Sequence, residues 1–348
     1  MSLKEIAKRV GVSPSTVSRV LNNTSASCAS KEIRDKIFEA ARETGYLPNE
    51  NAKKLRACGK GEAPRRSVSI VLARIKSLDE DPFFYDLFRS LEIALMEQRV
   101  AVDQVLYADQ SSADGKAAME FPKGQGVIIL GRCSQKLLEQ IRTFTGNVVG
   151  IWRNSMEFNL DEVVCDGQKA AELAMEHLIS LGHRRIAYIG DCSYESRYIG
   201  YCNALIRHGI PMNYAWVKQT DQTGEAGRLA FTELLEGPEA FSAVFCANDV
   251  TAVQVLGLLK ERRRQIKGKI SVISIDDIEE SQETTPMLTT IRIPREEMAH
   301  MAVMVLLDRM AKKHSEAVRV EFPCRIMNRS SCFPYEGQRT DGPKREIR

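Results

Sequence analysis

Four side chains near the N-terminus form a group suited to binding a polyanion. Ser15, Thr16, Ser18 and Arg19 fall on the polar side of a short predicted helix. Short hydroxyls bind phosphate oxygens, and an arginine can donate two parallel hydrogen bonds to the edge of a guanine. This group predicts contact with nucleic acid, provided that a small core holds the helix that carries it.

Three amphipathic segments predict that core. Residues 3–10 place apolar side chains at the i, i+3, i+4, i+7 spacing of one helix face. Ser13 as an N-cap and Pro14 at the first helical position begin a second helix that ends near Leu21. A third helix is expected over residues 31–44. The arrangement predicts a helix-turn-helix domain over residues 1–47.

The charge of the chain is unevenly distributed. Residues 1–66 contain 14 lysines and arginines against 7 aspartates and glutamates, whereas the whole chain carries 49 against 46. The N-terminal part is therefore net +7 and the remainder net −4. A basic domain on a mildly acidic body is typical of a polyanion-binding module joined to a module with another task.

The N-terminal sequence resembles the signature of the lactose-repressor (LacI/GalR) family of bacterial transcriptional regulators. The resemblance rests on residues 3–22 and on Gly45-Tyr46-Leu47-Pro48-Asn49. It extends over about residues 2–330 through further family-like strings at residues 81–84, 176–187, 247–249, 271–277 and 285–291. The resemblance implies that the second helix contacts DNA through the residues Ser13, Pro14, Ser15, Thr16, Ser18, Arg19 and Asn22.

Residues 48–66 are expected to form a hinge helix and linker. The resemblance implies that Asn49, Ala52, Lys53 and Leu55 contact DNA, with the leucine wedged between base pairs of the minor groove. The alternative is that Leu55 is simply an apolar linker residue. Asn51 departs from the family, which usually has an apolar residue at that position.

The rest of the chain alternates short apolar runs with helical patterns, which predicts doubly wound parallel sheets. We expect strands near residues 68–73, 101–107, 127–130, 148–151, 185–189, 243–247, 271–275, 288–293 and 318–329, and helices near residues 83–98, 135–144, 168–181, 197–207, 225–236, 249–262 and 295–312. The predicted fold class is α/β, an all-α head followed by a periplasmic-binding-protein-like core of two subdomains. This core spans residues 67–335, and the polar residues 336–348 are expected to form a mobile tail.

Ligands of parallel α/β sheets bind at the carboxyl ends of the strands. Side chains that follow the predicted strands, together with positions implied by the resemblance, give the candidate effector-binding residues Phe84, Trp152, Arg197, Gln222, Asn248 and Asp276. Aromatic rings with arginine, amide and carboxylate groups suit a small polar ligand of sugar-like or nucleoside-like chemistry. Alternatives remain: helix capping for Asn248 and Asp276, a salt bridge for Arg197, and core packing for Trp152.

Several functional classes are disfavoured. The chain has no dinucleotide-binding, P-loop, zinc-protease or nucleophile-elbow motif, so we expect neither catalysis nor a cofactor. The nine cysteines are scattered without a C-x-x-C pair, which disfavours a metal site or a disulfide and favours buried thiols. No apolar run is long enough for a membrane span and the N-terminus lacks a secretory signal, so a cytoplasmic location is expected.

The sequence thus predicts a regulator, most simply a repressor, that binds a pseudo-palindromic double-stranded DNA operator as a homodimer. A small-molecule effector bound between the two subdomains would switch it. The alternative from another class is a cytoplasmic small-molecule sensor whose head does not read DNA specifically. An intact polar face on the second helix and a basic hinge favour the regulator.

Overall fold

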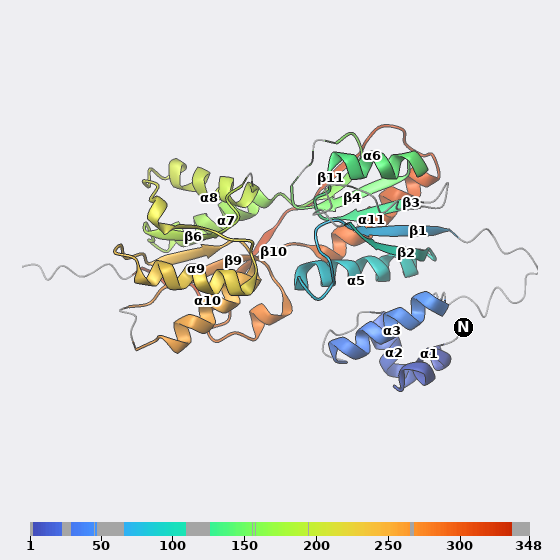
Figure 1. The fold of residues 1–348 in the computed structure, drawn as a ribbon, viewed down its shortest axis with the longest axis horizontal. Coiled ribbons are helices and arrows are strands. Elements are labelled where there is room, and N and C mark those ends of the chain that lie inside the picture. The colour runs from blue at the N-terminus through green and yellow to red at the C-terminus, as the bar shows by residue number, and fades with distance from the viewer. Residues whose placement is uncertain are drawn as a thin grey trace, which may run out of the picture. The chain divides into compact units, whose positions relative to one another are not determined.

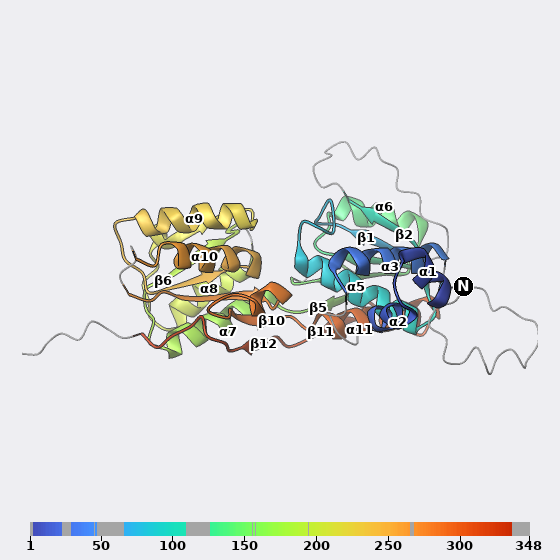
Figure 2. The same ribbon diagram turned by 90° about the horizontal axis from the view of Figure 1, so that it is seen from below.

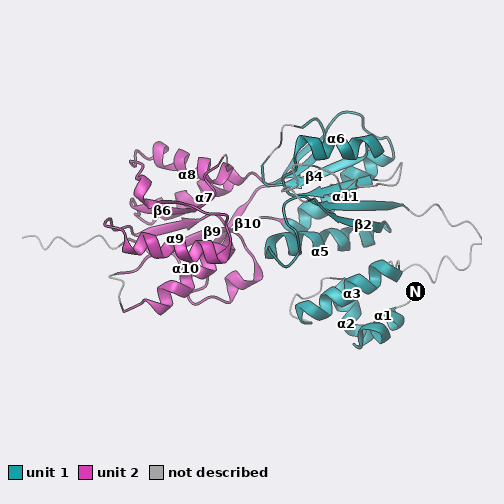
Figure 3. Cartoon of the chain, viewed as in Figure 1, with its two compact units in different colours: residues 1–164, 295–322 teal, residues 165–294, 323–348 magenta. Residues whose placement is uncertain are grey.

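The computed structural model divides the chain into two compact units (Figure 3). Unit 1 comprises residues 1–164 and 295–322, and unit 2 comprises residues 165–294 and 323–348. The chain therefore passes between the units three times. The structure describes residues 3–22, 29–44, 46, 66–108, 126–154, 156, 158–193, 195–264 and 268–335.

The head of unit 1 consists of three helices, α1 (Leu3–Val10), α2 (Pro14–Leu21) and α3 (Lys31–Thr44) (Figure 1). The core of the head contains one completely buried residue from each helix: Ile6 of α1, Val17 of α2 and Ile37 of α3. The turn between α1 and α2 contains Gly11 with φ +78°, a left-handed conformation that glycine adopts without a Cβ clash. The helix-turn-helix predicted from the spacing of apolar residues is confirmed.

Helix α3 also contacts helix α5 (Pro82–Glu97) within unit 1. The Asp35 carboxylate accepts a hydrogen bond from the hydroxyl of Tyr85 at 2.7 Å. The guanidinium of Arg89 lies over the ring of Phe38, 4.7 Å from its centroid. Arg89 also forms an ion pair with Glu92, a carboxylate with no solvent exposure. Burial of charge at this contact is compensated by ion pairing.

Unit 1 contains a six-stranded sheet in the order β11-β5-β4-β3-β1-β2, with every pairing parallel. The strands are β1 (Ser67–Leu72), β2 (Ala101–Tyr107), β3 (Gly126–Leu130), β4 (Val148–Trp152), β5 (Asp161–Val164) and β11 (Arg319–Glu321). Helix α6 (Gln135–Phe144) covers one face, and α5 and α11 (Arg295–Met310) cover the other (Figure 2). Both faces are covered, which explains why the central strands read as continuous apolar runs.

Unit 2 repeats this plan with the sheet order β12-β10-β9-β8-β6-β7. Its strands are β6 (Ile186–Gly190), β7 (Val217–Gln219), β8 (Ala243–Cys246), β9 (Ser271–Asp276), β10 (Thr289–Arg292) and β12 (Arg325–Met327). Helices α7 (Gly167–Ser180) and α8 (Ser196–Arg207) pack together on one face, and α9 (Gly224–Glu236) and α10 (Asp249–Glu261) on the other (Figure 1). The predicted pair of α/β halves is confirmed, although β12 runs antiparallel to β10.

The late segment over residues 318–329, predicted to contain strands, divides between the two units. Its first part, β11, pairs with β5 of unit 1, and its second part, β12, pairs with β10 of unit 2. Pro323 lies between them and has no N–H to donate to a strand neighbour, so one continuous strand is interrupted there. The short strands β5, which lies between β11 and β4, and β7, which lies at the edge of its sheet, were not predicted, because neither is an apolar run bounded by turn residues.

Candidate functional site

The polar face of α2 begins with a cluster of three hydroxyls. Ser13 caps the helix by accepting a hydrogen bond from the backbone N–H of Thr16 at 3.1 Å. The Ser13 Oγ also lies 2.7 Å from the Ser15 Oγ and 2.8 Å from the Thr16 Oγ1. Pro14, at the first helical position, is exposed beside them. Hydroxyls at a helix N-terminus form a natural site for a phosphate oxygen.

The remaining polar residues of the predicted DNA-contacting set lie farther along the same helix. Arg19 is exposed, and its Nε donates a long hydrogen bond of 3.4 Å to the carbonyl of Ser15. Asn22 follows the helix and donates through Nδ2 to the carbonyl of Ser18 at 2.8 Å. Helix α2 therefore presents hydroxyl, guanidinium and amide groups along one solvent-facing surface. The predicted hinge residues Asn49, Ala52, Lys53 and Leu55 lie outside the described residues, as does the tail from residue 336.

Unit 2 brings four of the six candidate effector residues together at the carboxyl ends of its strands. The centre is Arg197, whose side chain is 1% exposed and whose guanidinium reaches three acceptors. Its Nε donates to the Glu195 carboxylate at 2.9 Å, and its Nη1 donates to the carbonyl of Ala247 at 2.7 Å. Its Nη2 donates to the Gln222 side-chain oxygen at 2.7 Å. Burial is the largest single influence on the pKa of Arg197 and lowers it, but the charge and hydrogen bond of Glu195, together with the charge of Asp276, raise the pKa overall.

Gln222 and Asn248 extend this network. The Asn248 Nδ2 donates to the carbonyl of Gln222 at 2.9 Å, while its Oδ1 caps α10 by accepting from the backbone N–H of Thr251 at 3.1 Å. Gln222 has φ +67°, a left-handed conformation that is uncommon for a residue with a side chain. The capping alternative for Asn248 is therefore present, in a position that also joins the Arg197 cluster.

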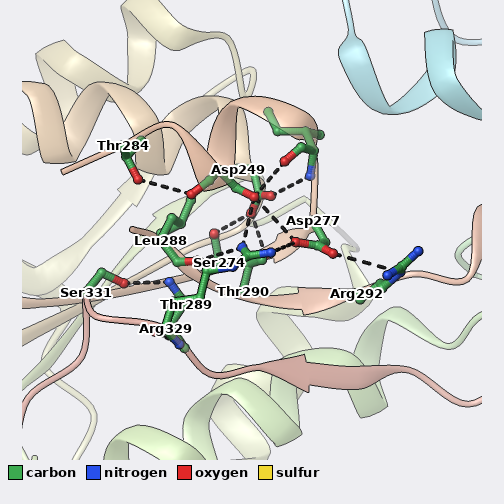
Figure 4. A network of polar contacts seen from close by, with 12 residues as sticks. Asp249, Ser274, Asp277, Thr284, Leu288, Thr289, Thr290, Arg292, Arg329 and Ser331 are labelled. Carbon is green, nitrogen blue, oxygen red and sulfur yellow. Dashed lines mark hydrogen bonds and ion pairs between the residues drawn. The ribbon is translucent and has the colours of Figure 1, made fainter. Parts of the chain in front are cut away.

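Asp276 ends β9 in an unusual backbone conformation. Its φ is +134° and its side chain is 2% exposed. Its charge contributes to the raised pKa of Arg197, so the two groups are electrostatically coupled. The next residue, Asp277, has φ +56° and forms ion pairs with Arg329 at 2.5 Å and Arg292 at 3.8 Å (Figure 4). Strained backbone conformations concentrate at functional sites, where surrounding contacts hold them in place.

A second carboxylate, Asp249, lies in the core behind this site. It accepts hydrogen bonds from the hydroxyls of Ser274 at 2.5 Å and Thr290 at 2.6 Å, and from the backbone N–H of Ile278 at 2.9 Å (Figure 4). Complete burial and the nearby charge of Asp276 raise the pKa of Asp249 to about 7, although these hydrogen bonds oppose the shift. Asp249 joins β9, β10 and α10, and it also holds the loop that follows Asp276 through Ile278.

The two candidate residues of unit 1 are both buried. Phe84 is 6% exposed, and its ring meets the ring of Phe83 edge-on. The Phe84 ring also lies so close to Gly131 that a Cβ added to this glycine would be 3.0 Å from it. Trp152 is 4% exposed, and its Nε1 donates to the Glu162 carboxylate at 2.7 Å. The structure therefore places the Trp152 ring in the core of unit 1, one of the two positions that the sequence left open.

The sequence did not point to Glu195 or to the network around Asp249. Glu195 lies two residues before Arg197 and outside the predicted helix over residues 197–207, so no sequence pattern marked it as the partner of Arg197. The hydroxyls that bind Asp249 belong to Ser274 and Thr290, which lie 25 and 41 residues away from it in the sequence. Only the folded sheet brings these groups together. A carboxylate directly after the Asn248 cap was visible in the sequence, but its burial was not.

Among the described residues, no cluster of three metal-ligating side chains is present. In the same part of the chain, every helix is too short or too polar to span a bilayer.

Two family models match the chain. Residues 2–49 match a model of bacterial regulatory proteins of the lacI family, and residues 175–332 match a periplasmic binding protein-like domain. The first covers the helix-turn-helix, and the second covers most of unit 2, including all four of its candidate effector residues.

Individual proteins match over nearly the whole chain. The probable HTH-type transcriptional repressor ExuR of Bacillus subtilis is 28% identical over 341 residues, which cover 95% of this chain and 98% of ExuR. The HTH-type transcriptional repressor CytR of Escherichia coli is 29% identical over 340 residues, 95% of this chain and 96% of CytR. Among solved structures, a complex of the transcriptional regulator CelR with cellobiose is 26% identical, with a TM-score of 0.67 over 95% of this chain and 99% of CelR.

Proposed function

The chain belongs to the lacI family of bacterial regulatory proteins, and from this premise we propose that it is a sequence-specific transcriptional repressor controlled by a small polar effector. The proposed role is binding, and no step of it makes or breaks a covalent bond. Its proposed place of action is the cytoplasm, where the DNA is.

The observation that carries this proposal is the polar face of α2. Its hydroxyl cluster at Ser13 and the exposed guanidinium of Arg19 lie on one surface, while Val17 and Val20 bury the opposite face in the head. A helix of this kind fits the major groove, where hydroxyls contact phosphates and an arginine distinguishes guanine from other bases. The net charge of +7 over residues 1–66 adds the attraction to DNA that is independent of sequence.

We assign the effector site to the carboxyl-end cluster of unit 2. Arg197, Gln222, Asn248 and Asp276 offer donors and acceptors in a buried setting, which suits a ligand rich in hydroxyls. The related CelR binds cellobiose, a ligand of this chemistry. We propose that Trp152 stabilises the carboxyl end of β4 from inside the core of unit 1, because its indole N–H already donates a hydrogen bond to the Glu162 carboxylate.

The proposed mechanism couples the two sites. A C2 homodimer presents one α2 to each half of a pseudo-palindromic operator, and the segment around Leu55 bridges to the minor groove. An effector that binds one arrangement of the two units more tightly changes the affinity for the operator. Linkage then requires that the operator change the affinity for the effector by the same factor.

Selection of bound duplexes from a random DNA pool tests the proposal. We expect an enriched inverted repeat for the wild-type protein. Arg19→Ala should relax the preference at one base pair of each half-site and weaken binding by about 1–3 kcal/mol. Lys36→Ala is the matched control, because it removes the same charge from the exposed side of α3. If Arg19→Ala weakens all sequences equally, Arg19 contacts only phosphate. If the wild-type protein enriches no sequence, the chain is a sensor rather than a repressor.

The effector assignment is tested on the selected duplex. Mono- and disaccharides and nucleosides are added to the complex, and any compound that shifts operator affinity is repeated with Asp276→Asn. We expect the variant to bind the duplex like the wild type and to lose the response. A variant that still responds would contradict the assignment of Asp276.

A further inference from the structure

Two of the three passages between the units run side by side. Strands β5 and β11 pair in parallel with Val164 beside Glu321, and the N–H of Phe322 then donates to the carbonyl of Val164 at 2.9 Å. A cysteine follows each passage: Cys165 is the next residue after β5, and Cys324 comes shortly after β11. Adjacent strands lie about 4.8 Å apart, so this pairing brings the two cysteines into the same neighbourhood.

The two thiols contact each other. A side-chain hydrogen bond joins Cys324 to Cys165, although the residues are 159 positions apart in the sequence. Cys165 has no solvent exposure, whereas Cys324 is partly exposed. Cys324 is therefore the more exposed residue of the pair.

The surroundings of Cys324 favour the thiolate, which is the reactive form. The hydrogen bond from Cys165 lowers the pKa of Cys324 most, and Lys169 in the first turn of α7 lowers it further, against burial and the charge of Asp166. Cys192 differs in this respect, because burial raises its pKa to about 11. The pair combines a partly exposed cysteine whose pKa is lowered with a second, buried cysteine that is its hydrogen-bond partner.

We propose that Cys165 and Cys324 form a redox-active pair that closes to a disulfide on reaction with a hydroperoxide. The Cys324 thiolate attacks the peroxide oxygen, breaking the O–O bond to give a sulfenic acid and, after protonation, water or an alcohol. The Cys165 sulfur then attacks the sulfenic sulfur, forms the S–S bond and releases water. The pair is oxidised by two electrons and the peroxide is reduced by two.

The disulfide would tie together two of the three segments that join the units. It would close a loop of nearly 160 residues, which includes most of unit 2. A cross-link over so long a loop restricts the unfolded chain strongly. It would also limit the torsion available where these two segments enter unit 2. The modification is thus placed to make the motion between the units depend on oxidants.

Peptide mapping of the full-length protein tests the proposal. The protein is treated with hydrogen peroxide, free thiols are blocked with iodoacetamide, and the digest is analysed with and without reduction. We expect a cross-linked peptide pair joining Cys165 to Cys324 that disappears with dithiothreitol. It should persist in Cys332→Ser, the matched control, because burial raises the pKa of Cys332 to about 12. Oxidation should also raise the urea midpoint of the wild type but not of Cys324→Ser.

A second probe measures the sulfur spacing without oxidation. Phenylarsine oxide bridges two thiols that lie in contact, so the wild type and Cys332→Ser should each bind it at this pair. Cys165→Ser and Cys324→Ser should each lose that binding while keeping a wild-type circular dichroism spectrum. Failure of the wild type to bind the arsenical, or oxidation that stops at a sulfinic acid on Cys324 with Cys165 still free, would overturn the proposal.

Discussion

Replacing Arg197 with methionine would leave the carboxylate of Glu195 inside unit 2 without its cation. Glu195 is 4% exposed and its carboxylate lies 2.9 Å from the Arg197 Nε. Removing one partner of a buried ion pair costs about 3–5 kcal/mol, because the remaining charge stays desolvated. The same substitution also leaves the Ala247 carbonyl and the Gln222 side chain without a donor. We therefore expect Arg197→Met to lower the free energy of unfolding of unit 2 by at least about 3 kcal/mol.

A double-mutant cycle separates charge from packing. Glu195→Gln with Arg197→Met removes both charges, so the pair should destabilise unit 2 by about 2 kcal/mol less than the sum of the two single changes. Native-state hydrogen exchange measured by mass spectrometry is the assay, because it reports the two units separately in one sample. Peptides from α8 and β8 should exchange faster in Arg197→Met, and peptides from β1 and β4 should not change.

Two results would refute this reasoning. If the double variant is destabilised by the full sum, the loss in Arg197→Met comes from packing and backbone hydrogen bonds rather than from a stranded charge. If peptides of β1 and β4 change as much as those of α8, the ion pair is not local to unit 2. The expected instability also matters for function, since a lost effector response in an Arg197 variant is meaningful only when unit 2 remains folded.

Three further variants test other features of the structure. Burial and the charge of Asp276 raise the pKa of Asp249 to about 7, so the folded protein retains a proton that the unfolded chain releases at lower pH. The free energy of unfolding should therefore fall by at most about 3 kcal/mol between about pH 5 and pH 8. In urea titrations Asp249→Asn should abolish most of this fall, and an unchanged dependence on pH would contradict the raised pKa. Ser13→Ala removes the cap of α2 and should cost the head about 1 kcal/mol in thermal unfolding, with no effect expected on hydrogen exchange in unit 2. Gly150→Ala should lower the free energy of unfolding by about 3 kcal/mol, because the added Cβ would lie 1.9 Å from the indole ring of Trp152. Near-wild-type stability would show that this ring moves freely. Gly146→Ala is the control, because a Cβ there would meet nothing within 4 Å.

The head and the helices of both units could be predicted closely from the sequence. The three head helices follow from a local pattern of apolar residues, an N-cap and a proline. Helices α6 and α8 end where the apolar periodicity ends. Arg197, Asn248 and Asp276 were predicted as effector-binding residues because they follow the carboxyl ends of strands, and Gln222 was predicted from the family resemblance. The structure brings these four residues together.

Strand β5 shows why other features could not be predicted. It begins with Asp161 and Glu162, two carboxylates that local rules place on the surface. Both are buried because distant groups bind them: Arg309 and His314 pair with Asp161, and Trp152 donates to Glu162. No pattern within four residues contains this information. Pairing of residues far apart in the sequence is likewise what joins Cys165 to Cys324, where spacing along the chain suggested only isolated buried thiols.

The threefold passage of the chain between the units also bears on how the protein is made. Helix α11 and strand β11 complete unit 1, yet the ribosome adds them only after residues 165–294 of unit 2. Unit 2 in turn needs β12, which comes later still. The nascent chain therefore finishes the three helices of the head long before either unit is complete. A chain cut short before residue 295 would retain the recognition helix while both parts of the regulatory body are unfinished.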